Sequence, residues 1–227
     1  MNGNPTRIII LPIMLALLTG HAVSLAAQPS NDEQRSRIGL SAGMGVSYVN
    51  VADVADYVNA LVQPAQRLSD FKTAVEFFGS VAVPVSRDWD LKLEYAYMLG
   101  TYNVGNQFFN GEFSFSAHMP TVIGQYVLVE EKTYNVKLGA GAGYHFGALT
   151  ESFGTVKDKL TGHGIGTIID LEANTAFGES FFGYIGGDAR WDFIGDLTAP
   201  TRTNAAGAVP TLHFFSVGAR FGFTYYF

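Results

Sequence analysis

The sequence predicts an all-β fold, an eight-stranded antiparallel up-and-down transmembrane β-barrel. Three observations predict it: eight segments alternate between apolar and small or polar residues, an export signal precedes them, and their connections alternate between short and long. Such alternation is typical of a strand with one apolar and one polar face. No later segment is apolar for 18 consecutive residues, so helical membrane spans are not expected.

The first 36 residues predict export of the chain. Arg7 precedes an apolar run at 8–18, and small residues follow up to Ala26, as in a secretory signal peptide covering residues 1–26. The run is shorter than the roughly 20 residues of a transmembrane helix, although an uncleaved anchor is the alternative. Residues 27–36 are polar and predict a short periplasmic tail. The barrel is expected to cover residues 37–227, and the absence of cysteine excludes disulfides.

Eight segments carry the strand pattern. They lie at 37–51, 71–86, 89–104, 111–130, 133–152, 163–178, 181–196 and 211–227. Each exceeds the roughly 9–11 residues with which a tilted strand crosses a bilayer. Short connections are expected at 86–88, 131–132 and 178–180, and long ones at 52–70, 105–110, 153–162 and 197–210. Short periplasmic turns and long extracellular loops are usual in such barrels, and an even strand count then predicts that both termini are periplasmic.

The two faces of the segments indicate which side meets lipid. In the first segment Leu40 and Val46 share a large apolar face, whereas Ser41 and Ser47 share a face of small residues. In the segment 133–152 the second face is largely glycine. A soluble sandwich would place Lys, Glu and Thr on its exposed face, whereas small residues suit the narrow interior of an eight-stranded barrel. The apolar face is therefore expected to contact lipid.

The last segment ends in alternating aromatic residues, Phe223, Tyr225 and Phe227. This ending resembles the closing strand of bacterial outer-membrane β-barrels, which typically finishes in Phe. The mature chain as a whole resembles the small outer-membrane barrels, the OmpA-like, OmpX-like and OmpW-like proteins. The resemblance implies a porin-like architecture in the Gram-negative cell envelope, contact with outer-membrane lipid and lipopolysaccharide, and recognition of the three aromatic residues by the barrel assembly machinery.

Charged residues of the strands are expected to point into the lumen, because a cation on the lipid face costs about 2–4 kcal/mol at mid-bilayer. Buried charges must pair, since an unpaired one is expensive. We therefore predict an ion-pair network that closes the lumen, with a conducting path as the alternative. Its expected members are Lys72, Glu76, Lys92, Glu94, Glu112, Lys137, Asp170, Glu172, Asp188, Arg190, Asp192 and Arg220.

Two histidines are candidates for a metal site or a pH switch. A two-residue turn at 131–132 would place His118 directly opposite His145 on neighbouring strands. Ordinary polar packing in the interior is the alternative. Pro120 lies between the turn and His118, and we expect a β-bulge and a change of phase there, which would break this alignment.

The first long connection predicts a short amphipathic helix at 53–62, capped by Asp53 and ended by Pro64. The loops 52–70 and 197–210 are the expected contact points for an extracellular ligand. The leading functional hypothesis is a structural or surface-interaction barrel without enzymatic activity or cofactor. The alternatives are a narrow channel for small or hydrophobic solutes and a lipid-modifying enzyme. The net charge of −6 gives no support for nucleic-acid binding.

Overall fold

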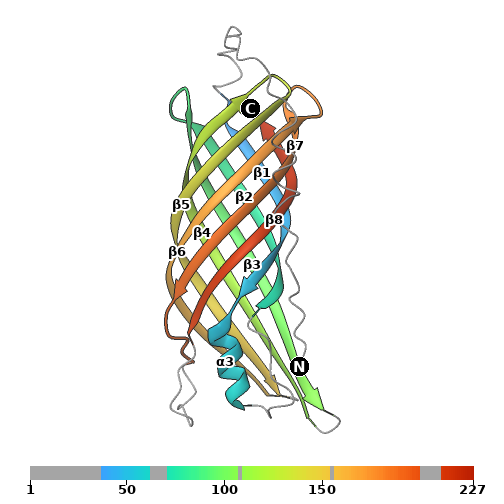
Figure 1. Cartoon of the computed structure of the whole chain (residues 1–227), viewed down its shortest axis with the longest axis vertical. Coiled ribbons are helices and arrows are strands. Elements are labelled where there is room, and N and C mark those ends of the chain that lie inside the picture. The colour runs from blue at the N-terminus through green and yellow to red at the C-terminus, as the bar shows by residue number, and fades with distance from the viewer. Residues whose placement is uncertain (1–36, 62–70, 107–108, 154–155, 200–210) are drawn as a thin grey trace, which may run out of the picture. The chain divides into compact units, whose positions relative to one another are not determined.

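The structure is a computed structural model that describes residues 37–61, 71–106, 109–153, 156–199 and 211–227. Its elements are β1 (Gly39–Asn50), α3 (Ala52–Leu61), β2 (Phe71–Pro84), β3 (Trp89–Asn106), β4 (Phe109–Glu130), β5 (Tyr134–Phe153), β6 (Val156–Ala176), β7 (Phe181–Ile194) and β8 (Leu212–Tyr226). Each strand pairs antiparallel with the next, and β8 pairs with β1, so the sheet closes on itself (Figure 1). The predicted eight-stranded up-and-down barrel is therefore confirmed.

The barrel has two different ends. At the turn end, the short connections 85–88, 131–133 and 177–180 lie together with the C-terminal residue Phe227. At the opposite end, which we call the helix end, α3 follows β1 (Figure 1). The signal peptide, the polar tail, Pro64 and most of the loops 52–70 and 197–210 lie outside the described residues.

Alternation along the strands decides which side chains enter the lumen. In β1, Leu40 and Tyr48 are 48% and 57% exposed on the outer surface, whereas Ser47 is 1% exposed. Successive side chains of a strand point to opposite faces, so one face of the sheet carries the large apolar residues and the other carries small and polar ones. This arrangement suits an outer surface solvated by lipid and a lumen filled by protein.

Glycine on the inner face makes room for large side chains from other strands. A Cβ atom on Gly139 would overlap the carboxylate of Asp170, and one on Gly166 would overlap the ring of His145. An eight-stranded barrel has an interior only just wide enough for its side chains. The inner glycines thus allow charged side chains to cross the lumen.

One strand departs from its predicted bounds. β6 begins at Val156 rather than at 163, so Gly162, His163 and Gly164 lie within the strand and pair with β5. The connection expected at 153–162 consequently shrinks to 154–155. The connection expected at 105–110 shrinks to 107–108, because β3 extends to Asn106 and β4 begins at Phe109. The glycines suggested a loop, but both are inward positions, where Gly162 leaves space for Leu197.

The helix α3 spans Ala52–Leu61, one residue from the predicted 53–62. Its cap differs from the prediction, because the side-chain oxygen of Asn50 accepts a hydrogen bond from the backbone N–H of Ala52 at 3.2 Å. The carboxylate of Asp53 instead accepts hydrogen bonds from the Thr211 hydroxyl at 2.5 Å and the His213 backbone N–H at 3.3 Å. The helix is thereby attached to the start of β8. Over the described ranges, no helix combines the length and the apolar character needed to cross a membrane.

Candidate functional site

Buried charged side chains occupy the middle of the lumen, and Glu94 of β3 lies at their centre. Its carboxylate accepts hydrogen bonds from Arg190 Nη2 at 2.7 Å and from Arg220 Nη1 at 3.0 Å and 3.1 Å. The Nζ atom of Lys92 lies 3.4 Å from the same carboxylate. The side chains of all four are at most 1% exposed. Residues about 100 positions apart in sequence therefore form one ionic cluster.

Two further carboxylates complete the contacts of the guanidinium groups. Arg220 Nε lies 3.0 Å from Asp188 Oδ1, and Arg190 Nε donates to Asp188 Oδ2 at 3.0 Å. Glu76 forms an ion pair with Arg220 and lies 3.7 Å from Arg190 Nε. Asp188 and Glu76 thus each lie between the two guanidinium groups, and charge-assisted contacts of this kind are stronger than neutral hydrogen bonds. Four strands, β2, β3, β7 and β8, are thus connected through the lumen.

Lys92 links this cluster to a second pair of acids on β6. Its ammonium donates to Asp170 at 2.7 Å and to Glu172 at 3.0 Å. The side-chain amide of Gln125 donates to the same two carboxylates at 3.2 Å and 2.9 Å. Buried ions need hydrogen bonds beyond their direct partner, and Gln125 supplies them. We call the nine residues around Glu94 and Lys92 the ionic core: Glu76, Lys92, Glu94, Gln125, Asp170, Glu172, Asp188, Arg190 and Arg220.

Hydrogen-bonded polar side chains close the lumen at the turn end. Lys137 lies 2.8 Å from Asp90. Asn174 donates to Asn135 at 2.9 Å and accepts from the hydroxyl of Thr224 at 2.7 Å. These bonds connect β5, β6 and β8 across the lumen, so this end of the barrel is filled by direct contacts between side chains.

Four predicted members of the charged network lie outside the ionic core: Lys137 pairs with Asp90 at the turn end, Asp192 contacts His145, and the other two are Lys72 and Glu112. Lys72 points inward, but it is only half-buried and its ammonium lies 5.0 Å from the centre of the Tyr102 ring. Glu112 is exposed and accepts a hydrogen bond from Ser114 at 3.1 Å, so its expected lumenal position is wrong. The expected change of phase at Pro120 does not occur, because β4 keeps one register against β5 on both sides of this proline.

The predicted pair of His118 and His145 is not formed. Glu130 pairs with Asn135, so four residues rather than two separate the first paired residues, and a bulge between Val127 and Val129 shifts the register again. His118 consequently lies opposite Phe146 and points outward, whereas His145 is buried in the lumen. The metal-site hypothesis for this pair is therefore wrong. Across the part of the chain that the structure describes, no group of three or more His, Cys, Asp and Glu side chains is placed to hold a metal ion.

His145 instead belongs to a buried polar chain that the sequence did not indicate. Its Nδ1 atom bonds the carboxylate of Asp192, and its Nε2 atom lies 3.1 Å from the hydroxyl of Thr121. The order acid, imidazole, hydroxyl is that of a hydrolase triad. All three side chains are at most 3% exposed, so the arrangement holds the wall together and gives a substrate no access.

Apolar side chains fill the lumen at the helix end, which the sequence analysis did not predict. This apolar plug includes Val49, Met98, Tyr102, Phe113, Phe115, Met119, Leu149, Leu160, Ile194, Leu212 and Phe214. Val54 and Val58 of α3 are fully buried against it. A row of inward apolar residues is the pattern of a soluble protein core rather than of a polar pore.

The strands reverse their polarity along their length. In β4 the inward residues change from Gln125 and Thr121 to Phe115 and Phe113, while the outward residues change from Val122 to Glu112. The apolar outer surface of β5 runs from Tyr134 to Phe146, and these 12 steps rise about 30 Å at a tilt of about 40°. This height matches the hydrocarbon core of a bilayer, which is about 30 Å thick. Beyond it, the outer surface is polar.

Comparison with solved structures shows the same architecture. The outer membrane protein OprG from Pseudomonas aeruginosa is 14% identical, with a TM-score of 0.50, covering 85% of this chain and 96% of that one. The chain has the fold of a small bacterial outer-membrane β-barrel. Ail, the attachment invasion locus protein of Yersinia pestis, is 11% identical (TM-score 0.49; 85% and 99% covered), and Neisserial surface protein A is 12% identical (TM-score 0.48; 84% and 97% covered). No protein-family model and no curated protein matches the chain. At these identities the likeness establishes the fold and no activity.

Proposed function

We propose that this protein is a closed outer-membrane barrel that acts as a rigid structural anchor and presents its helix end to the cell exterior. Packing of the lumen supports this proposal most directly: the ionic core lies in the middle, hydrogen-bonded polar side chains lie at the turn end, and the apolar plug with α3 lies at the helix end. A lumen packed in this way leaves the outer surface and the loops 52–70 and 197–210 as the places for contact with other molecules.

The long connections support this orientation. The two longest, 51–70 and 195–211, both lie at the helix end, and long connections of such barrels are usually extracellular. In this orientation both termini are periplasmic and α3 is extracellular. The polar outer surface beyond Phe146 is consistent with this orientation, because it extends past the apolar band into water. In this position the outer wall contacts outer-membrane lipid and lipopolysaccharide. The barrel assembly machinery would recognise Phe223, Tyr225 and Phe227 during insertion.

Single cysteines test the orientation, because the natural chain has none. Asp56 of α3 and Ser86 of the first short turn are both exposed. In intact cells, a membrane-impermeant maleimide should label Asp56→Cys, whereas Ser86→Cys should react only after the outer membrane is permeabilised. The reverse labelling pattern would contradict the proposed orientation.

Conductance in planar bilayers tests closure. The purified protein should insert and show no steady single-channel current, and Arg220→Met should unfold more easily without conducting. A stable current in the wild type would support the narrow channel for small or hydrophobic solutes instead. The third alternative is a lipid-modifying enzyme. Mass spectrometry would support it by detecting altered acyl chains after the protein is incubated with lipopolysaccharide. We expect no such change.

A further inference from the structure

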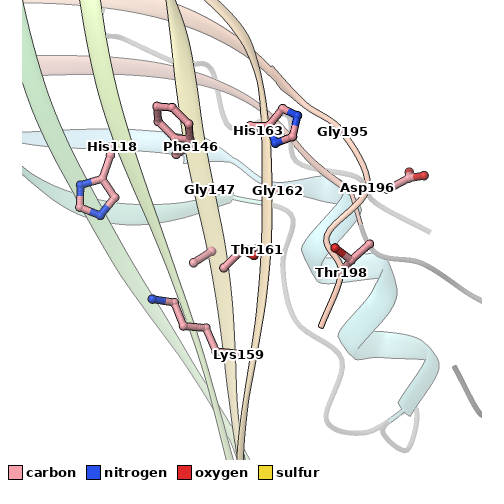
Figure 2. Close-up of a pocket in the computed structure, with 11 residues that line it drawn as sticks. His118, Phe146, Gly147, Lys159, Thr161, Gly162, His163, Gly195, Asp196 and Thr198 are labelled. Carbon is pink, nitrogen blue, oxygen red and sulfur yellow. The ribbon is translucent and has the colours of Figure 1, made fainter. Parts of the chain in front are cut away.

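A groove of about 600 Å³ lies in the outer wall of the barrel, across β4, β5 and β6. Figure 2 shows His118 on one side, Phe146 and His163 toward the apolar band, and Lys159 nearer the helix end. Its floor is made of small residues, Gly147, Ala148, Thr161, Gly162 and Gly195. The groove is therefore a depression in the wall: its floor has no bulky side chains, and basic side chains surround it.

The position of the groove matters as much as its lining. Phe146 is the last large apolar residue on the outer face of β5, and His118 and His163 lie on the neighbouring strands at this boundary. Lys159 lies further toward the helix end, on the polar part of the wall. The groove thus spans the level at which acyl chains give way to lipid headgroups.

Aromatic contacts hold the two histidines in place. His118 Nδ1 lies 2.6 Å from the hydroxyl of Tyr95, and its ring packs on Tyr97 with centroids 4.7 Å apart. The ring of His163 packs on Tyr144 at 5.4 Å. Because Tyr95 already occupies Nδ1 of His118, a ligand would meet its Nε2 atom. Lys159 and Asp196 are the charged residues that line the groove, and in Figure 2 the carboxylate of Asp196 points away from the other lining side chains.

The polar side chains of the groove favour an anion. Lys159 supplies an ammonium group, and the imidazole rings of His118 and His163 can each donate an N–H hydrogen bond. A lipid headgroup at this level of the wall would leave its acyl chains on the apolar band, which ends at Phe146.

We propose that this groove binds the phosphate of an outer-leaflet glycolipid, with Lys159, His118 and His163 as donors. This inference rests on the proposed outer-membrane function. It names a lipid-borne phosphate rather than a free one, because the groove is continuous with the apolar outer surface.

The test uses the full mature protein in mixed micelles, titrated with diphosphoryl lipid A at pH 7.5. Lys159→Met should weaken binding about threefold to fivefold. His118→Leu combined with His163→Leu removes two donors and should weaken binding as well. Lys157→Met is the matched control, because Lys157 is exposed on the same strand and does not line the groove.

Two further ligands identify what is bound. Lipid A without its phosphates should bind more weakly than the diphosphoryl form, and inorganic phosphate at the same concentration should not compete. Equal binding of the dephosphorylated lipid, competition by inorganic phosphate, or equal effects of Lys159→Met and Lys157→Met would overturn the proposal. Heat-modifiable migration in cold gels verifies that each variant is folded. Binding in micelles does not depend on orientation, so failure of the maleimide experiment would count against the proposed function and not against this site.

Discussion

Replacing Arg220 with methionine tests the role of the ionic core. Its guanidinium contacts three buried carboxylates, those of Glu76, Glu94 and Asp188. The ionic core holds five acids against three bases, so the loss of one cation leaves carboxylates that the remaining bases cannot balance. Removing one partner from a buried ion pair costs about 3–5 kcal/mol, and we expect Arg220→Met to lower the free energy of unfolding by that amount. This corresponds to a change of more than about 100-fold in the equilibrium constant.

The measurement is urea unfolding of the barrel in phospholipid vesicles, followed by the fluorescence of Trp89 and Trp191 and extrapolated linearly to zero urea. Lys157→Met removes an exposed cation and should change the free energy of unfolding by less than about 0.5 kcal/mol. Glu76→Gln should cost less than Arg220→Met, because it reduces the excess of acids. A loss below about 1 kcal/mol for Arg220→Met, or a larger loss for Glu76→Gln, would refute the reasoning.

Three other changes test the packing and the assembly signal. Gly100→Ala should destabilise the barrel by about 1–3 kcal/mol, because its Cβ atom would overlap the Phe115 ring, while Gly124→Ala, whose Cβ has no atom nearer than 3.9 Å, should be nearly neutral in the same urea titration. Val58→Ala removes two fully buried methyl groups and should weaken the docking of α3 by about 1.6 kcal/mol, which amide hydrogen exchange of the helix would report. Deletion of Phe227, whose side chain is 67% exposed, should leave the unfolding of the refolded barrel almost unchanged but reduce the amount of folded barrel in cells, as seen by heat-modifiable migration.

Strand positions could be predicted from the sequence because alternation is a local property. Seven of the eight segments begin within two residues of their predicted start, and β6 is the exception. The inward position of the charged side chains could be predicted because placing an ion in lipid is costly. This cost applies wherever a strand crosses the membrane. Glu94 and Arg220 could therefore be assigned to one interior without knowledge of the strands between them.

Register and depth could not be predicted in the same way. Four residues separate Glu130 from its partner Asn135, and the bulge near Val127 shifts the pairing again. The bulge leaves Leu128 and Val129 both exposed, but it falls in an apolar stretch, where the sequence shows no change of phase. The two shifts separate His118 from His145. The apolar plug was not predicted, because the sequence does not show where each strand leaves the membrane. Beyond that point the outer face becomes polar, and large apolar residues such as Phe113 and Phe115 can face inward. Tertiary contacts also decide that Asn50 rather than Asp53 caps α3.

The central claim is that the large apolar face of every strand meets lipid. Spin labels on single cysteines at Leu138, Leu171 and Phe223, which lie on the outer face of β5, β6 and β8, measure this directly in bilayers. Each label should be more accessible to dissolved oxygen, which partitions into lipid, than to a water-soluble nickel chelate, whereas a label at Asp56 should show the reverse. Greater accessibility to the nickel chelate at any of the three strand positions would contradict the claim.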